Sequence, residues 1–330
     1  MSVVKKFKTR VYLRLSKRNK DSKMLEEMIK INQIFFNWNE RMHMTHPGKE
    51  DPDKIYYVIR VFDRVEGLLS LYFKGIKQII WARENGYIPY IDFDSNKCQY
   101  HVERQINGTN NAWNYYFKQP FTMTASELKN KKNVLLSGWS KQNQNVQKLS
   151  VETVEHNPIR EICQSDCAVQ PYVLDMVEDI AKEKFVSGKT LGVFLRGTDY
   201  TALKPKGHYK QPTVEQVINK IDDFCCQYDI SKIFIVTEDY TIFQKIKIKY
   251  GDIVFSSDND FIKDYKANDY LESAFQNDPY ERGLKYLVRL VLLTKCDYLV
   301  SSITNGSLFV LAEKQNDYKD KYLFDLGRYE

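Results

Sequence analysis

Charged residues stand at the end of an apolar run in the second half of the chain. The run TLGVFL (190–195) predicts a buried strand, and Arg196 and Asp199 follow directly after it. A guanidinium carries a permanent charge in a fork geometry that suits a pyrophosphate. Asp199 could accept a proton in a reaction or pair with Arg196 or a loop N–H. His208, in the loop that follows, is either a base, an acceptor contact or a structural residue.

A serine-rich segment later in the chain is a second candidate for anion binding. In SSITNGSLF (301–309) a predicted strand ends in two serines and continues into a predicted helix. Hydroxyls and free backbone N–H groups at a helix amino terminus attract anions. An ordinary capped helix has the same pattern, and neither GxxxxGK[ST] nor GxGxxG is present. The candidate anion ligands are Ser301, Ser302, Asn305, Gly306 and Ser307.

The segment VTEDY places three polar residues after another predicted strand. Thr237, Glu238 and Asp239 follow the apolar run that begins at Lys232. Carboxylates at such a position can accept hydrogen bonds from ribose hydroxyls or from a guanine edge. They can equally cap a helix that starts near Thr241. Both interpretations remain open.

Two pairs of aspartates have a spacing that can hold Mg²⁺ or Mn²⁺ on a diphosphate. They are Asp92 with Asp94, and Asp258 with Asp260. Each pair lies in a turn-rich stretch, and no cluster of histidine or glutamate supports it. Turn chemistry is the favoured interpretation, so no metal site is predicted.

The elements that must position these residues alternate regularly in the second half of the chain. Short apolar runs predict strands at 190–195, 232–238, 252–257, 297–302 and 322–327. Amphipathic stretches predict helices between them, at 213–228, 240–251, 282–296 and 305–314. Such alternation is typical of a parallel sheet that helices cover on both faces, as in a Rossmann-like domain.

The first half repeats this pattern less regularly. Strands are predicted at 54–62, 87–93 and 133–138, with a helix that runs to about Glu84. The predicted organisation is a basic tail (1–20), an acceptor-side α/β domain (21–170) and a donor domain (171–330). Two such domains bring the carboxyl ends of both sheets to one cleft, where ligands bind.

Composition and charge limit the class of protein. The 330 residues are 43% hydrophobic, and the formal net charge is +6. Residues 1–20 hold eight lysines and arginines and no acid, and the remaining 41 basic and 43 acidic residues leave the body at −2. A nucleic-acid groove through the body is therefore not expected. The tail could lie on an anionic membrane surface or be a solvated terminus.

Location is inferred from the same composition. No apolar stretch reaches the length of a membrane-spanning helix, and the amino terminus lacks a signal peptide pattern. The six cysteines show no CxxC spacing, which fits a reducing compartment. A cytoplasmic protein is expected, with peripheral contact at the inner face of the membrane as an open alternative.

Several motifs together resemble those of the fucosyltransferase-like GT-B glycosyltransferases. This group includes α1,6-fucosyltransferases, the rhizobial nodulation fucosyltransferase, protein O-fucosyltransferases and a bacterial group linked to capsular and surface polysaccharides, which is the nearest match. The motifs are FLRGTDY, VTEDY, CDYLVSSITNGS, GYIPYID, NAWNYYFKQP and FDLGRYE. The resemblance spans roughly residues 55–330. It implies two Rossmann-like domains facing one cleft and transfer of a sugar, often fucose from GDP-fucose, with inversion and without a metal or cofactor.

The resemblance assigns roles to four of the candidate residues. It implies that Arg196 grips the β-phosphate of the donor and stabilises the leaving nucleotide. It implies that Asp239 contacts the nucleoside, and that Ser302 and Ser307 lie in the segment that lines the diphosphate.

Two positions depart from the pattern of the resembled family. Phe194 stands where related proteins have a histidine, which weakens any transfer of base recognition to this chain. Lys204 stands near the position of the glutamate proposed as the base in α1,6 enzymes, and a charged lysine cannot take that part. The general base stays open between Asp199 and His208.

The acceptor is expected to contact the first domain. Trp113 and Tyr116 could stack on sugar rings, or could equally pack in the core of that domain. Glu66 and Gly67, at a turn before a helix, would face the cleft. The expected partners are a nucleotide-sugar donor and a glycan or lipid-linked oligosaccharide acceptor. A different nucleotide sugar, or a protein that binds such ligands without catalysis, remains an alternative.

Overall fold

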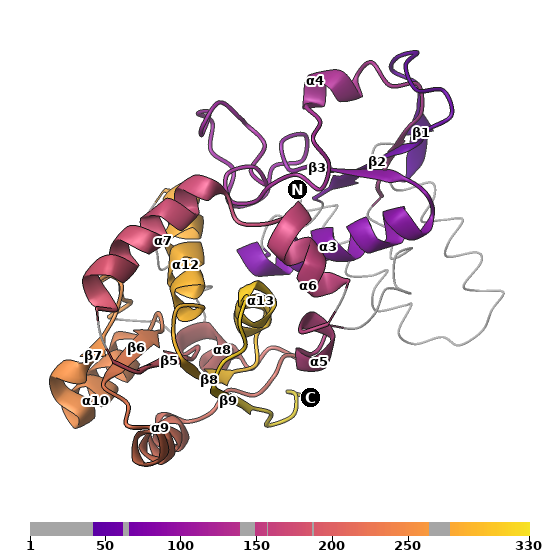
Figure 1. Ribbon diagram of the computed structural model, residues 1–330. Coiled ribbons are helices and arrows are strands. Elements are labelled where there is room, and N and C mark those ends of the chain that lie inside the picture. Colours follow the sequence, from indigo (N-terminus) through magenta and orange to yellow (C-terminus); the bar gives the residue numbers. More distant parts are fainter. Residues whose placement is uncertain (1–41, 62–65, 139–148, 157, 187, 264–277) are drawn as a thin grey trace, which may run out of the picture.

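A computed structural model of the chain describes residues 42–61, 66–138, 149–156, 158–186, 188–263 and 278–330 (Figure 1). The predicted basic tail, residues 1–20, lies outside these ranges. Two sheets organise the described residues, one from each half of the chain.

A five-stranded sheet forms from the second half of the chain. Its strands are β5 (Thr190–Phe194), β6 (Lys232–Val236), β7 (Val254–Phe255), β8 (Tyr298–Ser302) and β9 (Asp320–Phe324). They stand in the order β7-β6-β5-β8-β9, and every neighbouring pair is parallel. Their carboxyl ends therefore share one edge. This arrangement confirms the predicted parallel sheet.

Helices cover both faces of this sheet (Figure 1). They are α7 (Pro171–Lys184), α9 (Val214–Tyr228), α10 (Tyr240–Tyr250), α12 (Pro279–Leu293) and α13 (Asn305–Glu313). Strand side chains alternate between two hydrophobic clusters. Phe194 and Leu299 belong to the cluster that contains α12 and α13, whereas Val193 and Val300 belong to the cluster with α9 and α10. Burial on both faces explains the continuous apolar runs in the sequence.

A smaller sheet forms from the first half. Its strands are β1 (His43–Thr45), β2 (Tyr56–Arg60), β3 (Ile88–Asp92) and β4 (Val134–Leu136). The order is β1-β4-β2-β3; β2 is parallel to both β3 and β4, and β1 is antiparallel to β4. Helix α3 (Leu68–Glu84) packs against β2 and β3 and ends at the predicted residue. Strand β1 was not predicted, because three residues give too short a pattern.

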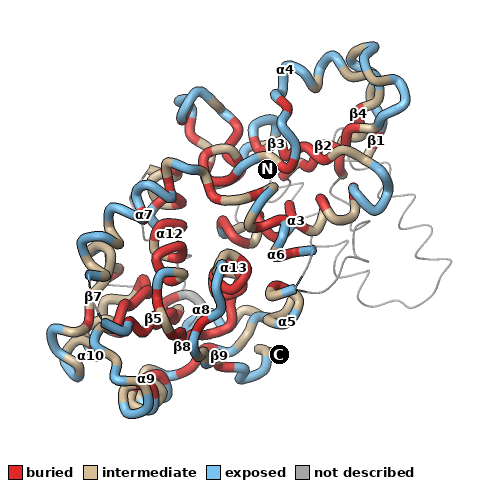
Figure 2. Tube along the Cα trace, viewed as in Figure 1, coloured by how far each residue is buried: buried red, intermediate tan, exposed pale blue. Residues whose placement is uncertain are grey.

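The two halves share one hydrophobic cluster. The ring of Tyr72 on α3 meets the ring of Phe309 on α13 at 5.4 Å. Between the two sheets, α5 (Val151–Val154), α6 (Ile159–Glu161) and the π-helix η3 (Ile162–Asp166) also contact α13. In Figure 2 buried positions concentrate on the strands and on α3, α12 and α13. The predicted domain boundary at residue 170 and the cleft between the domains stay predictions.

The other described helices are short. They are α4 (Ala125–Leu128), α8 (Thr198–Leu203) and the 3₁₀ turn η4 (Gly251–Ile253). Within the described ranges, no helix has the length and apolar character needed to cross a membrane. All six cysteines are free thiols.

Candidate functional site

An ion pair joins the ends of two neighbouring strands in the five-stranded sheet. Phe194 of β5 stands beside Val236 of β6, and the chain continues on each strand to Arg196 and Glu238. The Nε of Arg196 lies 3.3 Å from Oε1 of Glu238. The Arg196 side chain is 17% exposed and that of Glu238 is 8% exposed. Arg196 is therefore a largely buried cation at the carboxyl edge of the sheet, with part of its surface open.

Glu238 also organises the loop that follows Arg196. Its Oε1 accepts hydrogen bonds from Gly197 N at 2.9 Å and from Thr198 Oγ1 at 2.8 Å. A Cβ on Gly197 would lie 2.7 Å from Oδ2 of Asp239, so a larger residue here would have to displace the Asp239 side chain. Three donors on one buried oxygen fix the backbone from which the Arg196 side chain projects. The sequence did not indicate this role for Glu238.

Thr237 and Asp239, the other residues of this segment, serve local structure. Asp239 is the N-cap of α10, and its Oδ1 accepts from Thr241 N at 2.8 Å and Ile242 N at 3.1 Å. Thr237 is buried, and its Oγ1 accepts from Asp239 N. Of the two interpretations of Asp239 given by the sequence, this structure shows the helix cap.

The serine segment reaches the same edge of the sheet on the other side of β5. Phe194 is registered with Ser301 of β8, so the start of α13 lies beside the end of β5. A Cβ on Gly306 would lie 2.7 Å from Cε1 of Phe194 and 2.7 Å from Oη of Tyr286 on α12. The Tyr286 hydroxyl is thus next to the first turn of α13, a placement the sequence did not reveal.

The expectation of free N–H groups at Gly306 and Ser307 is corrected. Thr304 Oγ1 accepts from Gly306 N at 3.1 Å and from Ser307 N at 3.3 Å. Ser307 Oγ accepts from Thr304 N and donates to Thr304 O. These contacts form a capping box, which satisfies the first donors of the helix internally. An anion at the start of α13 would therefore interact mainly with the positive end of the helix dipole and with Asn305, which is half-buried.

The two serines of β8 point their hydroxyls into the protein. Ser301 Oγ donates to Ser302 O at 2.8 Å, and Ser301 is 1% exposed. Ser302 is fully buried, is registered with Phe324 of β9, and its Oγ has no hydrogen-bond partner among the described residues. Neither hydroxyl is open to a ligand in this arrangement.

The two candidate bases lie in the segment of the chain that connects β5 to α9. Asp199 is in α8, and its side chain is outside the described part of the structure. His208 is exposed in the loop after α8, where its carbonyl accepts from Tyr329 N at 2.9 Å. Because parallel strands end at one edge, this loop belongs to the edge that carries Arg196.

The proposed stacking role of Trp113 and Tyr116 is wrong for this structure. Trp113 is 1% exposed and stacks on Tyr72 at 5.5 Å, and its Nε1 donates to Lys118 O. Tyr116 is fully buried, and its Oη donates to Tyr280 O at 3.0 Å. Large aromatic rings stabilise a hydrophobic core by the area that they bury. Trp113 and Tyr116 therefore take the core-packing role, which the sequence allowed as the alternative.

Glu66 and Gly67 stand at the start of α3. Glu66 forms an ion pair with Lys74 and accepts a hydrogen bond from Ser70. Gly67 is the exposed N-cap, with open space where a Cβ would be. Their expected contact with an acceptor stays a prediction.

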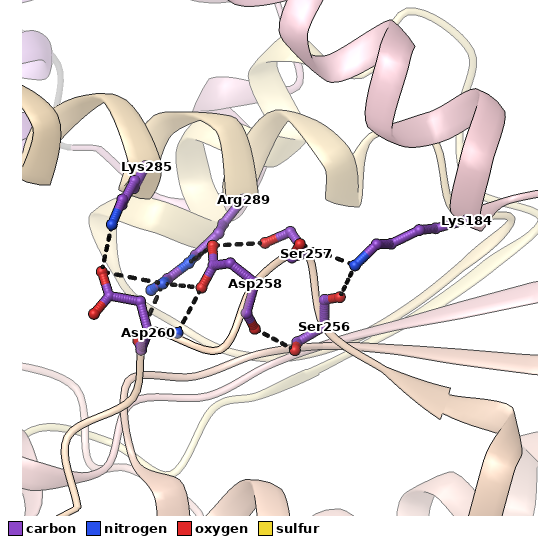
Figure 3. A network of polar contacts seen from close by, with 7 residues as sticks. All are labelled: Lys184, Ser256, Ser257, Asp258, Asp260, Lys285 and Arg289. Carbon is purple, nitrogen blue, oxygen red and sulfur yellow. Dashed lines mark hydrogen bonds and ion pairs between the residues drawn. The ribbon is translucent and has the colours of Figure 1, made fainter.

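The aspartate pairs are occupied by other contacts. Asp92 accepts from Asp94 N and Ser95 N in a turn. Asp258 is held by Arg289, whose Nε and Nη2 lie 3.0 and 2.5 Å from its two carboxylate oxygens (Figure 3). Burial acts to raise the pKa of Asp258, but the hydrogen bonds and charge of Arg289 outweigh it and lower this pKa. Within the described ranges, no three His, Cys, Asp or Glu side chains are placed to hold a metal.

Comparison with known proteins gives only structural similarities. No family model matches the chain, and neither does any curated protein. The chain is similar to the fucosyltransferase NodZ from Bradyrhizobium, with 14% identity, a TM-score of 0.46 and coverage of 78% of this chain and 92% of that one.

The chain is also similar to two further solved structures. Arabidopsis thaliana FUT1, solved as a variant with GDP, has 10% identity, a TM-score of 0.47 and coverage of 98% of this chain and 79% of that one. POFUT1 with GDP-fucose has 9% identity, a TM-score of 0.37 and coverage of 83% and 74%. All three are fucosyltransferases. The predicted α/β fold is confirmed by the two sheets themselves.

Proposed function

We propose that the chain is an inverting glycosyltransferase that moves a sugar from a nucleotide-sugar donor to a glycan acceptor. The best candidate for the donor is GDP-fucose. The best candidate for the process that the enzyme serves is the synthesis of a capsular or surface polysaccharide. Both refinements come from the motifs that the sequence shares with the fucosyltransferase-like group. The acceptor would be a glycan or a lipid-linked oligosaccharide.

The observation that carries this proposal is the position of Arg196. It stands at the carboxyl edge of a parallel sheet, the edge where ligands bind in such folds. Its side chain is mostly buried yet 17% exposed, and Glu238 fixes its backbone loop. The start of α13 follows the neighbouring strand β8. A guanidinium and a positive helix end at one edge favour a diphosphate between them.

These groups would act on the leaving nucleotide. In an inverting transfer the acceptor hydroxyl oxygen bonds to the anomeric carbon while the bond from that carbon to the phosphate oxygen breaks. Negative charge grows on the departing diphosphate, and a fixed cation stabilises that charge in the transition state. Arg196 would supply this cation, so the proposal requires no metal or other cofactor.

The hydroxyl proton would pass to a base on the loop side of the site. Asp199 and His208 remain the candidates, and a base in hydrogen-bond reach contributes roughly 10²- to 10⁴-fold. Trp113 and Tyr116 have no part in the acceptor site, since both are core residues. A cytoplasmic location, with residues 1–20 in peripheral contact with an anionic membrane surface, is part of the proposal.

A thermal-shift screen with GDP, UDP, CDP and ADP tests the donor. A nucleotide present at 100 times its Kd stabilises the folded chain by about 2.7 kcal/mol. We expect GDP to give the largest shift, and release of GDP from GDP-fucose in the presence of a glycan acceptor to establish transfer. A largest shift with UDP would indicate another nucleotide sugar. Binding without turnover of any sugar would indicate a binding protein, and no shift with any nucleotide would contradict the proposal.

A further inference from the structure

The residues that follow β9 pair with the loop that carries His208. Three backbone hydrogen bonds join them: Gly207 N to Tyr329 O at 2.8 Å, Tyr329 N to His208 O at 2.9 Å, and Lys210 N to Gly327 O at 2.9 Å. Tyr209 and Arg328 form an antiparallel bridge between them. We call this pairing of residues 207–210 with residues 327–329 the clasp. It joins two segments that are far apart in the sequence, PKGHYK and LGRYE.

The side chain of Arg328 ties the two sides of the clasp together. Its Nη1 donates to Gly207 O at 2.6 Å. Its guanidinium lies 3.9 Å from the centre of the Tyr209 ring, in a cation–π contact. One side chain thus contacts both sequence neighbours of His208, Gly207 and Tyr209. A charged donor on a carbonyl makes a stronger hydrogen bond than a neutral one.

The clasp lies at the edge of the sheet where Arg196 stands. The loop leaves α8, which follows β5, and enters α9, which leads to the opposite end of β6. Strand β9 is parallel to β8, so the chain beyond Phe324 also emerges at the carboxyl edge. Figure 1 shows the C-terminal end beyond β9. Both partners of the clasp therefore meet at the edge proposed to bind the donor.

The loop needs such support to keep one conformation. Gly207 has φ +82°, in the left-handed region, and nothing lies within 4 Å of the place where its Cβ would be. Residues 206–208 are exposed. Few side chains pack against this turn, in which His208 N donates to Pro205 O at 3.1 Å, so the contacts of the clasp help to hold the backbone of the loop in one conformation.

We propose that Arg328 is a positioning residue of the transfer reaction, because it holds the loop that carries His208, one of the two candidate bases. This inference rests on the proposed glycosyltransferase function. Arg328 would not touch donor or acceptor. Its loss would misplace the loop while leaving Arg196 and the nucleotide site unchanged.

Steady-state kinetics and nucleotide binding of Arg328 variants test this role. Arg328→Ala is expected to lower kcat for transfer by about 10- to 100-fold, the effect of a small misplacement at a reacting centre. The Kd for GDP should stay within about 2-fold of the wild type, because the donor side is intact. Arg328→Lys keeps a charged donor for Gly207 O and should restore most of the lost kcat. Arg328→Gln lacks the charge and should not restore the lost kcat.

Amide hydrogen exchange reports the clasp independently of activity. Exchange at residues 207–210 should rise in Arg328→Ala by about 10-fold or more and return toward the wild-type rate in Arg328→Lys. The matched control is Arg160→Ala, since Arg160 also donates to backbone carbonyls, those of Lys314 and Gln315. It should change neither kcat nor exchange in the clasp.

If Arg328→Ala does not fold, Tyr209→Leu replaces it, since this variant removes the ring under the guanidinium and leaves the hydrogen bond to Gly207 O. An intermediate loss of kcat is then expected. Unchanged kcat in the folded variants, unchanged exchange, or a rise in the Kd for GDP as large as the fall in kcat would overturn the positioning role. A wild-type chain that turns over no nucleotide sugar contradicts the proposed function itself, and the positioning role falls with it.

Discussion

Glu238 and Arg196 form an ion pair across the ends of two parallel strands, with Oε1 of the glutamate 3.3 Å from Nε of the arginine. The same oxygen holds Gly197 N and Thr198 Oγ1. A buried carboxylate with three donors fixes the orientation of a cation more strictly than an exposed pair could. The position of the cation at this edge of the sheet therefore depends on Glu238 as much as on Arg196.

Substitution of Glu238 should separate charge from hydrogen bonding. Glu238→Gln keeps an oxygen acceptor for Gly197 N and Thr198 Oγ1 but removes the charge facing Arg196. We expect kcat for transfer to fall about 10- to 100-fold while Tm changes by only a few degrees. Glu238→Ala should also lower Tm, because buried donors lose their acceptor. Glu215→Gln, in an exposed pair with Lys245, is the control and should be neutral. Equal activity of Glu238→Gln and the wild type would contradict this role.

Gly306 is required for the close approach of α13 to β5. A Cβ there would meet Phe194 and Tyr286 at 2.7 Å, so Gly306→Ala must displace either these two rings or the first turn of α13. We expect a loss of about 1–3 kcal/mol in the free energy of unfolding, measured by urea denaturation, and weaker nucleotide binding. Gly67→Ala, where a Cβ meets nothing within 4 Å, should change stability by less than about 1 kcal/mol. A Gly306→Ala variant as stable as the wild type would contradict the close packing of the first turn of α13 against Phe194 and Tyr286.

The Asp258–Arg289 pair should make stability depend on acid pH. The pKa of Asp258 is lowered in the folded chain from its usual 3.8, so the ionised carboxylate stabilises the fold above pH 3.8, and this contribution disappears as pH falls through the lowered pKa. Asp258→Asn should therefore cost about 1–3 kcal/mol at pH 7 and less at pH 3, which lies below the usual pKa. Asp223→Asn, in an exposed pair with Lys220, is the control. If Asp258→Asn lost the same free energy of unfolding at both pH values, the ionisation of Asp258 would not be linked to folding.

Glu313 should make stability depend on pH in the opposite direction. Burial raises its pKa from 4.5 to about 8, and its Oε1 has no hydrogen-bond partner within the described residues. The folded chain holds a proton there that the unfolded chain has lost, so stability falls as pH rises from 4.5 to about 8. Glu313→Gln should be more stable than the wild type by roughly 1–3 kcal/mol at pH 8 and equal to it near pH 4.5. Urea denaturation at the two pH values measures this, and no gain at pH 8 would contradict it.

The sequence predicted the larger sheet because its strands are buried on both faces. Continuous apolar runs such as TLGVFL carry that signal directly, and parallel order then places Arg196 and the serine segment at one edge. The ion pair between Arg196 and Glu238 was beyond prediction, since it depends on which strands are neighbours. The clasp likewise joins residues that only the fold brings together.

The roles of individual polar and aromatic side chains were harder to predict. A capping box and an anion site use the same residue types, so the hydroxyls of Thr304 and Ser307 could not be assigned from their order in the chain. Trp113 and Tyr116 illustrate the same ambiguity, because a ring that could stack on a sugar can also fill a core.

The most direct measurement compares the binding of GDP and of guanosine to the wild type and to Arg196→Ala by calorimetry. If Arg196 and the start of α13 hold the diphosphate, Arg196→Ala should weaken GDP by about 10- to 100-fold and leave guanosine within about 2-fold. Circular dichroism and a cooperative melting transition above the assay temperature would establish that the variant is folded. Equal affinity of the wild type and the folded variant for GDP, or an equal loss for GDP and guanosine, would contradict the account.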